Sequence, residues 1–277
     1  MRKVLLVSGC SWTDQNFKSD IYRNLDTSWP KWPEILGNKL GMEVINLGQS
    51  GGGNEFIHGS LVDKIVSMDK DTIGLVMAAW TGSERRDWER PYFKIDKNGN
   101  KDISSYTWHN KACDVEGNVY YWARKSQRYA YSLQEICKLH NIKLKQFQMI
   151  SPWPSTRAGF SDHKIGTKYQ MSIELRQKNM EIFEDVSKEF IKSPYYNILD
   201  RASYINLSAI EDINCNYDHQ IGFHCVNRST SYKKHHDPAA SESEKHHDPL
   251  STEVGREDGH PNHNGHIKIA EYLYENL

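Results

Sequence analysis

Three short apolar segments, separated by helical patterns, limit what this chain can fold into. They cover residues 4–7, 42–47 and 72–80, and turn residues follow each of them. Runs of this kind are typical of strands buried on both faces, as in parallel sheets. Between them, residues 32–40 and 56–66 carry apolar side chains at helical spacing, and Gly41 ends the first helix. This β-α-β-α-β order predicts a parallel sheet with helices on both faces.

The rest of the chain predicts further core elements and two insertions. We expect a long helix over 119–140, a fourth strand over 142–150, a helix over 169–191, a short fifth strand at Ile198-Leu199 and a last helix after His266. Residues 84–118 are polar, with turn phrases that favour a hairpin lying above the sheet edge like a lid. Residues 203–257, called the His-rich loop below, have the composition of an exposed loop. Because both chain ends look like core elements, residues 1–277 are expected to form one domain.

Composition and charge exclude several classes of partner. The formal net charge of the 277 residues is -1, so no basic field favours nucleic acid or an anionic membrane surface. No apolar run is long enough to span a bilayer, and the apolar part of the first residues is too short for a signal peptide. The five cysteines are odd in number and widely scattered, unlike a disulfide framework. We therefore expect a cytoplasmic protein without nucleic-acid or membrane partners, while the sequence indicates no oligomeric state.

Polar turns follow each of the first three predicted strands. They contain Ser11, the glycines of residues 51–53 and Thr81. The carboxyl ends of parallel strands meet at one edge of a sheet, and ligands bind there in open α/β sheets. His260, on a predicted loop before the last helix, can reach the same edge. A serine in such a turn is also a common helix N-cap, so a purely structural role for Ser11 stays open at this point.

These residue types together fit acyl transfer. That chemistry needs a hydroxyl nucleophile, a base for its proton, a carboxylate that orients the base, and donors for the oxyanion. Ser11 supplies the hydroxyl and His260 the imidazole, while Asp258 or Glu257 supplies the carboxylate. The backbone N–H of Gly51 and a nearby side-chain donor complete the set.

The phrases that carry these residues resemble those of the SGNH or GDSL-type hydrolases. The first family block, Gly-Asp-Ser, is similar to Gly9-Cys10-Ser11. The second, Asn-x-Gly-x-Ser-Gly, is similar to residues 46–51. The last, an Asp-x-x-His followed by Pro and then Gly-His, is similar to residues 257–261 and to Gly265-His266. The resemblance covers both ends of the chain and the strand order, but neither residues 84–118 nor the His-rich loop.

The resemblance implies a fold and an activity. The fold would be α/β, a three-layer α/β/α sandwich with a parallel, flavodoxin-like sheet of about five strands. Ser11 would be the nucleophile and His260 the base. The N–H groups of Gly51 and Ser11 would bind the oxyanion. The family activity would be hydrolysis of an ester or a similar acyl bond, without a cofactor.

The chain departs from the family pattern at Cys10 and at Thr81. Cys10 replaces the usual Asp, a residue that is not the nucleophile. Thr81 stands where the third family block has an oxyanion-donating Asn, and Asn54 is the substitute donor that we consider. Loss of one such donor costs on the order of 3 kcal/mol in the transition state. Trp80 and Trp153 each end a strand, where they would either wall the site or cap the core.

The orienting carboxylate has two candidates. The family spacing from His260 points to Glu257, whereas Asp258 lies one residue nearer. We choose Asp258 because Asp is the residue type of the family, and we keep Glu257 as the alternative.

Aromatic residues in polar surroundings suggest the substrate class. Such rings suit the faces of sugars, so O-acetyl groups on carbohydrates are the favoured ester, while packing of the insertion against the core is an equal alternative role for the rings. One alternative is a non-catalytic SGNH-like binding or structural module. Another is a metal-dependent phosphoesterase that uses the His-rich loop, with Cys215, His219, His224 and Cys225 as candidate ligands. The glycines of residues 51–53 before a helix could also cradle a phosphate.

Overall fold

The computed structural model describes most of the chain. The described residues are 2–19, 22–83, 85–87, 89–95, 101–108, 111–112, 119–150, 192–205, 253–255 and 258–277. The predicted helix over 169–191, Trp153 and nearly all of the His-rich loop lie outside them. Within the described residues, no helix is long and apolar enough to cross a membrane.

A five-stranded parallel sheet forms the centre of the molecule. Its strand order is β2-β1-β3-β8-β9, the flavodoxin-like order, and every neighbouring pair is parallel. The strands are β1 (Val4–Ser8), β2 (Glu43–Asn46), β3 (Ile73–Trp80), β8 (Leu144–Gln148) and β9 (Tyr204–Ile205). The predicted α/β class, the parallel sheet and its five strands are confirmed.

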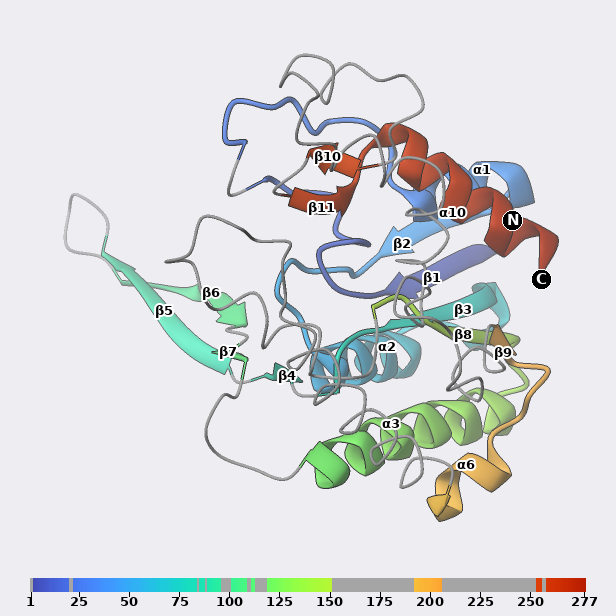
Figure 1. Ribbon diagram of the computed structural model, residues 1–277. Coiled ribbons are helices and arrows are strands. Elements are labelled where there is room, and N and C mark those ends of the chain that lie inside the picture. The colour runs from blue at the N-terminus through green and yellow to red at the C-terminus, as the bar shows by residue number, and fades with distance from the viewer. Residues whose placement is uncertain are drawn as a thin grey trace, which may run out of the picture.

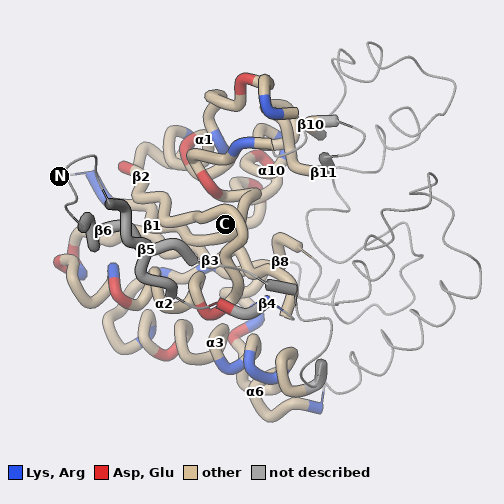
Figure 2. The backbone as a smooth tube through the Cα atoms, turned by 90° about the vertical axis from the view of Figure 1, so that its left-hand side faces the viewer, with Lys and Arg blue, Asp and Glu red and all other residues tan. Residues whose placement is uncertain are grey.

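Helices cover both faces of this sheet, which gives three layers (Figure 1). One face carries α1 (Trp32–Leu40) and α10 (His263–Glu275), and the other carries α2 (Asn54–Ser67), α3 (Val119–Leu139) and the short α6 (Pro194–Ile198). A 3-10 turn, η1 (Lys70–Thr72), leads into β3. Acidic and basic residues are interspersed along these elements rather than gathered on one of them (Figure 2).

The alternation of side chains along the strands builds a separate core on each face. In β3, Leu75 and Met77 pack toward α1 and α10, whereas Val76 packs toward α2 and α3. The same alternation holds in β1, where Leu5 and Leu6 are both fully buried on opposite faces. Strands with apolar side chains on both faces read as continuous apolar runs, which explains the sequence pattern.

Helix boundaries follow local capping signals. Gly41 ends α1 with a left-handed φ of 66°, as its position predicted. The last helix begins at His263, four residues before the predicted start after His266. Asn262 causes the earlier start, because its side chain accepts a hydrogen bond from the Gly265 N–H at 3.0 Å and so caps the helix.

The described residues of the first insertion form two antiparallel ribbons. Short strands β4 (Arg85–Arg86) and β7 (Lys111–Ala112) form one, while β5 (Glu89–Ile95) and β6 (Lys101–Trp108) form the predicted hairpin. Figure 1 shows this hairpin extending away from the body of the molecule on the side where the parallel strands end.

Two local predictions near the end of the chain are wrong. Ile198 closes α6 and Leu199 follows it, so the fifth strand is Tyr204–Ile205 and not Ile198-Leu199. Pro194 favours a helix start just before the apolar pair, which overrides its strand tendency. His260 lies in a strand rather than a loop, because β11 (Asp258–Pro261) pairs antiparallel with β10 (Glu253–Gly255).

Candidate active site

A serine and a histidine from opposite ends of the chain meet beyond the carboxyl end of β1. His260 Nε2 lies 2.8 Å from Ser11 Oγ, within hydrogen-bond distance. The Phe17 ring packs on the imidazole with a centroid separation of 4.4 Å, and the Trp12 ring lies 6.4 Å away. Both aromatic residues are buried. They form an apolar wall that holds the imidazole beside the hydroxyl.

Ser11 is placed by a tight turn. The carbonyl of Cys10 accepts hydrogen bonds from the N–H groups of Thr13 at 2.8 Å and Asp14 at 3.1 Å. Ser11 and Trp12 therefore occupy the corner of the turn, with the serine half-buried and Trp12 buried. Cys10 is fully buried and packs in the core beneath the turn.

Asp14 ties this turn to the one that follows β2. Its Oδ2 accepts hydrogen bonds from Ser50 N at 2.8 Å and Ser50 Oγ at 2.6 Å, and its Oδ1 accepts one from Asn16 N at 2.8 Å. Hydrogen bonds to a charged group are stronger than neutral ones. Because Ser50 directly precedes Gly51, Asp14 fixes the position of the predicted oxyanion donor relative to Ser11.

Hydrogen bonds of Asn46 and close packing at Gly48 make a second connection between the same two turns. Asn46 Nδ2 donates to Thr13 O at 2.8 Å, and Asn46 Oδ1 accepts from Gly48 N at 2.9 Å. A Cβ atom at Gly48 would lie 2.8 Å from Thr13, closer than side chains tolerate. Glycine is therefore required where the turn after β2 passes over the turn after β1.

Gly51 lies at the crest of the second turn. Gly52 N donates to Gln49 O at 3.0 Å, and Gly51 has a φ of 84°, which is the third position of a type II turn. Within the described part of the chain, neither Gly51 N–H nor Ser11 N–H has a hydrogen-bond partner. An oxyanion hole requires backbone donors aimed at one point, so these two N–H groups are the candidates among the described residues.

The other predicted substrate contacts build the frame of the site instead. Asn54 Nδ2 donates to Thr81 O at 3.0 Å and Ser126 Oγ at 2.9 Å, and its Oδ1 accepts from Thr81 N at 2.8 Å. Both amide hydrogens are thus used, which leaves none for an oxyanion. The Thr81 side chain is fully buried, and its hydroxyl has no partner among the described residues.

Trp80 belongs to the core. It is 2% exposed, and its indole N–H donates to Gln146 Oε1 at 3.1 Å. Of the two roles considered for Trp80, the structure places it in the capping role, because its side chain points toward α2 and α3 within the buried cluster of that face.

Two residues of the first insertion, Asp87 and Arg85, form hydrogen bonds with the glycine turn of residues 51–53. Asp87 accepts hydrogen bonds from Gly53 N at 2.7 Å and Phe56 N at 2.8 Å, so it caps the start of α2. Burial raises the pKa of the Asp87 carboxyl, and the two backbone N–H groups oppose that rise. Arg85 Nη1 donates to Gly52 O at 3.1 Å. A carboxylate already occupies this helix N-terminus, so the glycines of residues 51–53 offer no empty phosphate cradle.

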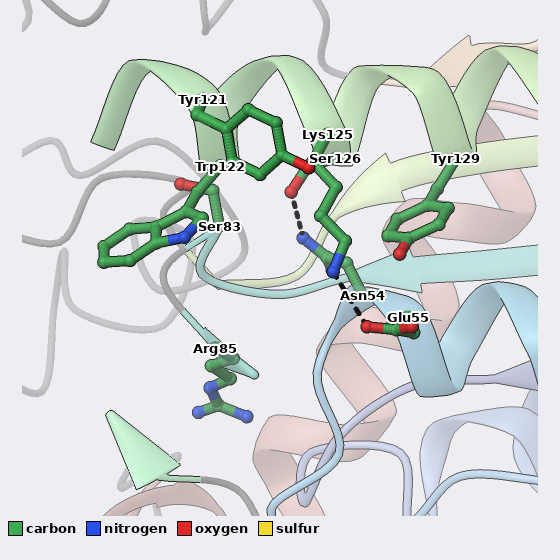
Figure 3. Close-up of a pocket in the computed structure, with 9 residues that line it drawn as sticks. All are labelled: Asn54, Glu55, Ser83, Arg85, Tyr121, Trp122, Lys125, Ser126 and Tyr129. Atoms are coloured by element: carbon green, nitrogen blue, oxygen red, sulfur yellow. Dashed lines mark hydrogen bonds and ion pairs between the residues drawn. The ribbon is translucent and has the colours of Figure 1, made fainter. Parts of the chain in front are cut away.

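A pocket of about 170 Å³ lies beside the contact between Arg85 and the glycine turn (Figure 3). Its wall is formed by Asn54 and Glu55 at the start of α2, by Arg85, and by one face of α3 that includes Tyr121 and Lys125. Lys125 Nζ forms an ion pair with Glu55 Oε2 at 2.8 Å. Because the lining residue Asn54 directly follows the glycines of residues 51–53, the pocket adjoins the turn that carries Gly51.

Some predicted residues are described in part or not at all. The backbone of Asp258 pairs with that of Gly255, two residues before His260 in β11, whereas Glu257 lies outside the described residues. The candidate metal ligands in the segment 215–225 also lie outside them. Within the residues that are described, no group of three or more His, Cys, Asp or Glu side chains could hold a metal ion.

Sequence reasoning missed three positioning residues, namely Asp14, Asn46 and Asp87. Asp14 and Asn46 each stand within a few residues of a strand end, which is a signal that could have found them. Asp87 lies in a polar insertion, and no pattern in the sequence links it to Gly53.

Comparisons with known proteins add context to this geometry. No family model and no curated protein matches the chain. Among solved structures, it is similar to a protein from Desulfitobacterium hafniense DCB-2 that is assigned provisionally to the lipolytic G-D-S-L family, with 13% identity, a TM-score of 0.42 and 100% of both chains covered. It is also similar to an acetyl xylan esterase, AlAXEase, with 10% identity, a TM-score of 0.43 and 99% of both chains covered. These values are too low to transfer an activity, and the fold rests on the sheet order itself.

Proposed function

We propose that this chain is a serine hydrolase that cleaves an acyl ester. The observation that carries the proposal is the 2.8 Å contact between Ser11 Oγ and His260 Nε2 at the carboxyl end of a parallel sheet. A nucleophile and a base within hydrogen-bond reach of each other are the signature of nucleophilic catalysis. Two backbone N–H groups on neighbouring turns, neither with a partner among the described residues, support the same reaction.

The reaction proceeds in two acyl transfers. Ser11 Oγ attacks the ester carbonyl carbon as His260 accepts the hydroxyl proton, and the bond between that carbon and the alcohol oxygen breaks. The alcohol leaves with the proton from His260, and the acyl group stays on Ser11. Water then loses a proton to His260 and attacks the same carbon, which releases the carboxylic acid and restores Ser11.

The charge that develops on the carbonyl oxygen needs preorganised donors. The N–H groups of Gly51 and Ser11 fill this role in the proposal, and the Asp14–Ser50 bonds hold them in register. Asp258 orients His260, with Glu257 as the alternative. Comparison of Asp258→Asn with Glu257→Gln decides between the two, because only the orienting carboxylate controls the tautomer of the imidazole and its loss costs orders of magnitude in turnover.

A fluorophosphonate probe tests the proposal directly. We expect wild-type protein to gain the mass of a single adduct and to hydrolyse p-nitrophenyl acetate. Ser11→Ala is expected to do neither, while Ser60→Ala, a serine of α2 that bonds to Ser8, keeps both. Circular dichroism of each variant establishes that it is folded. A folded wild-type protein that gains no adduct, or an adduct that survives in Ser11→Ala, overturns the proposal.

We extend the proposal to O-acetyl groups on carbohydrates as the natural ester class. Aromatic side chains close to the glycine turn support this choice, since their faces suit sugar rings. Turnover of acetylated sugars well above that of p-nitrophenyl butyrate is the expected result, and a preference for longer acyl chains contradicts it.

A further inference from the structure

We infer that the pocket between Arg85 and α3 binds a single neutral pyranose ring and seats the sugar part of the ester. This inference rests on the proposed function, because it assigns the alcohol side of the substrate to a place beside the glycine turn. The pocket is separate from the Ser11–His260 pair and is built from the start of α2, the root of the first insertion and the first turns of α3 (Figure 3).

The lining combines rings with hydrogen-bonding groups. Tyr121, Trp122 and Tyr129 contribute aromatic side chains from the pocket-facing side of α3, and Lys125 and Ser126 lie among them. Positions i, i+4 and i+8 of a helix share a face, so the sequence of α3 places this set together. Tyr121 is 54% exposed and lies toward the mouth. Sugars present an apolar ring face and a rim of hydroxyls, and this lining offers a partner for each.

A cation of the pocket lining is already paired with a carboxylate, which favours a neutral ligand. Lys125 is paired with Glu55 at 2.8 Å, and its Nζ also lies 5.6 Å from the centre of the Tyr129 ring. Arg85 donates to Gly52 O; burial raises the pKa of the Asp87 carboxyl, and the nearby charge of Arg85 opposes part of that rise. Lys125 is thus neutralised by Glu55, and the charge of Arg85 acts on the nearby carboxylate of Asp87. The polar groups of the lining residues can exchange hydrogen bonds with the hydroxyls of a sugar.

The pocket has the size of one sugar ring. At the roughly 30 Å³ that a water occupies in the liquid, its volume of about 170 Å³ holds about six waters. This is the space of one small ring, so an extended chain does not fit inside the pocket.

The wall of the pocket is bonded to the turns of the proposed acyl site. Arg85 holds Gly52 O, one residue from Gly51, and Asn54 holds the backbone of Thr81 at the end of β3. Asn54 also donates to Ser126 on α3 (Figure 3). A ring seated here lies against the same Gly51–Asn54 segment that supplies the proposed oxyanion donor.

Binding can be tested without turnover. We would titrate methyl β-D-glucopyranoside and methyl β-D-xylopyranoside into the Ser11→Ala protein and follow ligand saturation-transfer NMR. Saturable binding of at least one glycoside is expected. Adding Tyr121→Ala should weaken it at least tenfold, whereas adding Tyr274→Ala, a tyrosine of α10 that is 48% exposed, should not. Absence of saturable binding, or equal binding in both double variants, overturns the inference.

Kinetics separate this inference from the proposed function. In the Ser11-containing protein, Tyr121→Ala should lower kcat/KM for an O-acetylated methyl glycoside at least tenfold relative to kcat/KM for p-nitrophenyl acetate. An equal decrease for both substrates contradicts the pocket assignment but leaves the esterase intact. Failure of wild-type protein to turn over either substrate contradicts the proposed function, while glycoside binding to the Ser11→Ala protein is still measurable.

Discussion

His266 is a buried histidine that serves as a hydrogen-bond acceptor. Its Nδ1 accepts the Trp32 N–H at 3.2 Å, which joins the last helix to the start of α1. Burial lowers the pKa of His266 to about 3, and the positive charge of Lys31 adds to the effect. The imidazole is therefore neutral in the folded protein near neutral pH.

This histidine should make the protein less stable in mild acid. Its pKa is about 3 when folded and 6.5 when unfolded, so the unfolded state binds the extra proton between these values. The free energy of unfolding should fall by up to about 1.4 kcal/mol for each pH unit below 6.5. His266→Asn keeps an acceptor near Nδ1 but does not titrate, and urea unfolding at about pH 7 and about pH 5 should show a flatter dependence. His263→Asn, exposed on the same helix, is the control. An unchanged slope in His266→Asn contradicts the assignment.

Asp14 offers a test of how the two site turns are held together. Asp14→Ala removes three hydrogen bonds to a buried carboxylate and should destabilise the fold by about 3 kcal/mol. Because Gly51 is then no longer held in register, the rate of fluorophosphonate labelling at Ser11 should drop at least tenfold. Asp26→Ala, an exposed residue of the following loop, should label at the wild-type rate. Wild-type labelling by folded Asp14→Ala would show that the turns keep their register without it.

At the scale of elements, α2 depends on a residue outside itself. Gly53 occupies the N-cap position and has no side chain to satisfy the first N–H groups. Asp87 supplies the missing acceptor from the first insertion, and its charge suits the positive end of the helix dipole. The insertion is thereby fastened to the helix that follows the proposed oxyanion turn.

Removal of this cap should loosen the start of α2. Asp87→Ala is expected to lower the free energy of unfolding by about 1–2 kcal/mol, the usual cost of losing an N-cap. Hydrogen exchange of the Phe56 amide should accelerate, because its acceptor is gone. Asp69→Ala removes the comparable cap of the exposed η1 turn and serves as the control. Unaltered Phe56 exchange in Asp87→Ala would mean that water or another group replaces the carboxylate.

Elements with a strong internal pattern could be predicted from the sequence. The helix α1 has apolar residues at helical spacing and Gly41 at its end, and β3 is an apolar run between turns. Ile198-Leu199 failed as a strand because two apolar residues fit either element, and Pro194 decided for helix. The start of α10 was misplaced because the capping role of Asn262 was overlooked.

The candidate site was predictable only where its residues stand at the ends of elements. Ser11 and His260 each occupy such a place within a familiar phrase, and the fold brings them together. The bonds of Asn54 to Thr81 and of Asp87 to Gly53 join residues about 30 positions apart. Neither periodicity nor a short sequence motif reveals such long-range pairings. The hydrogen bonds that surround the site could therefore be found only in the structure.

At the scale of the whole molecule, one sheet separates two cores. The cluster on the α2 and α3 face and the cluster on the α1 and α10 face share no helix, yet both are built on the same strands. The first strand pairs with β2 and β3, and the last helix packs on α1. The first strand and the last helix therefore belong to the same three-layer structure.

The shared sheet predicts that both cores unfold together as one domain. Leu133 of α3 and Leu273 of α10 are fully buried on opposite faces, so Leu133→Ala and Leu273→Ala should each cost about 2–5 kcal/mol. Leu139→Ala, 79% exposed on α3, should change stability by no more than about 0.5 kcal/mol.

Denaturant unfolding, followed by tryptophan fluorescence and by far-UV circular dichroism, measures these effects. Each buried variant should shift a single transition that the two probes report alike. The double variant should equal the sum of the single effects to within about 0.5 kcal/mol, because the sheet separates the two sites. Two transitions, with each substitution moving only one of them, would instead mean that the faces fold independently. The turns that hold Ser11 and Gly51 would then have to be stabilised by one core alone.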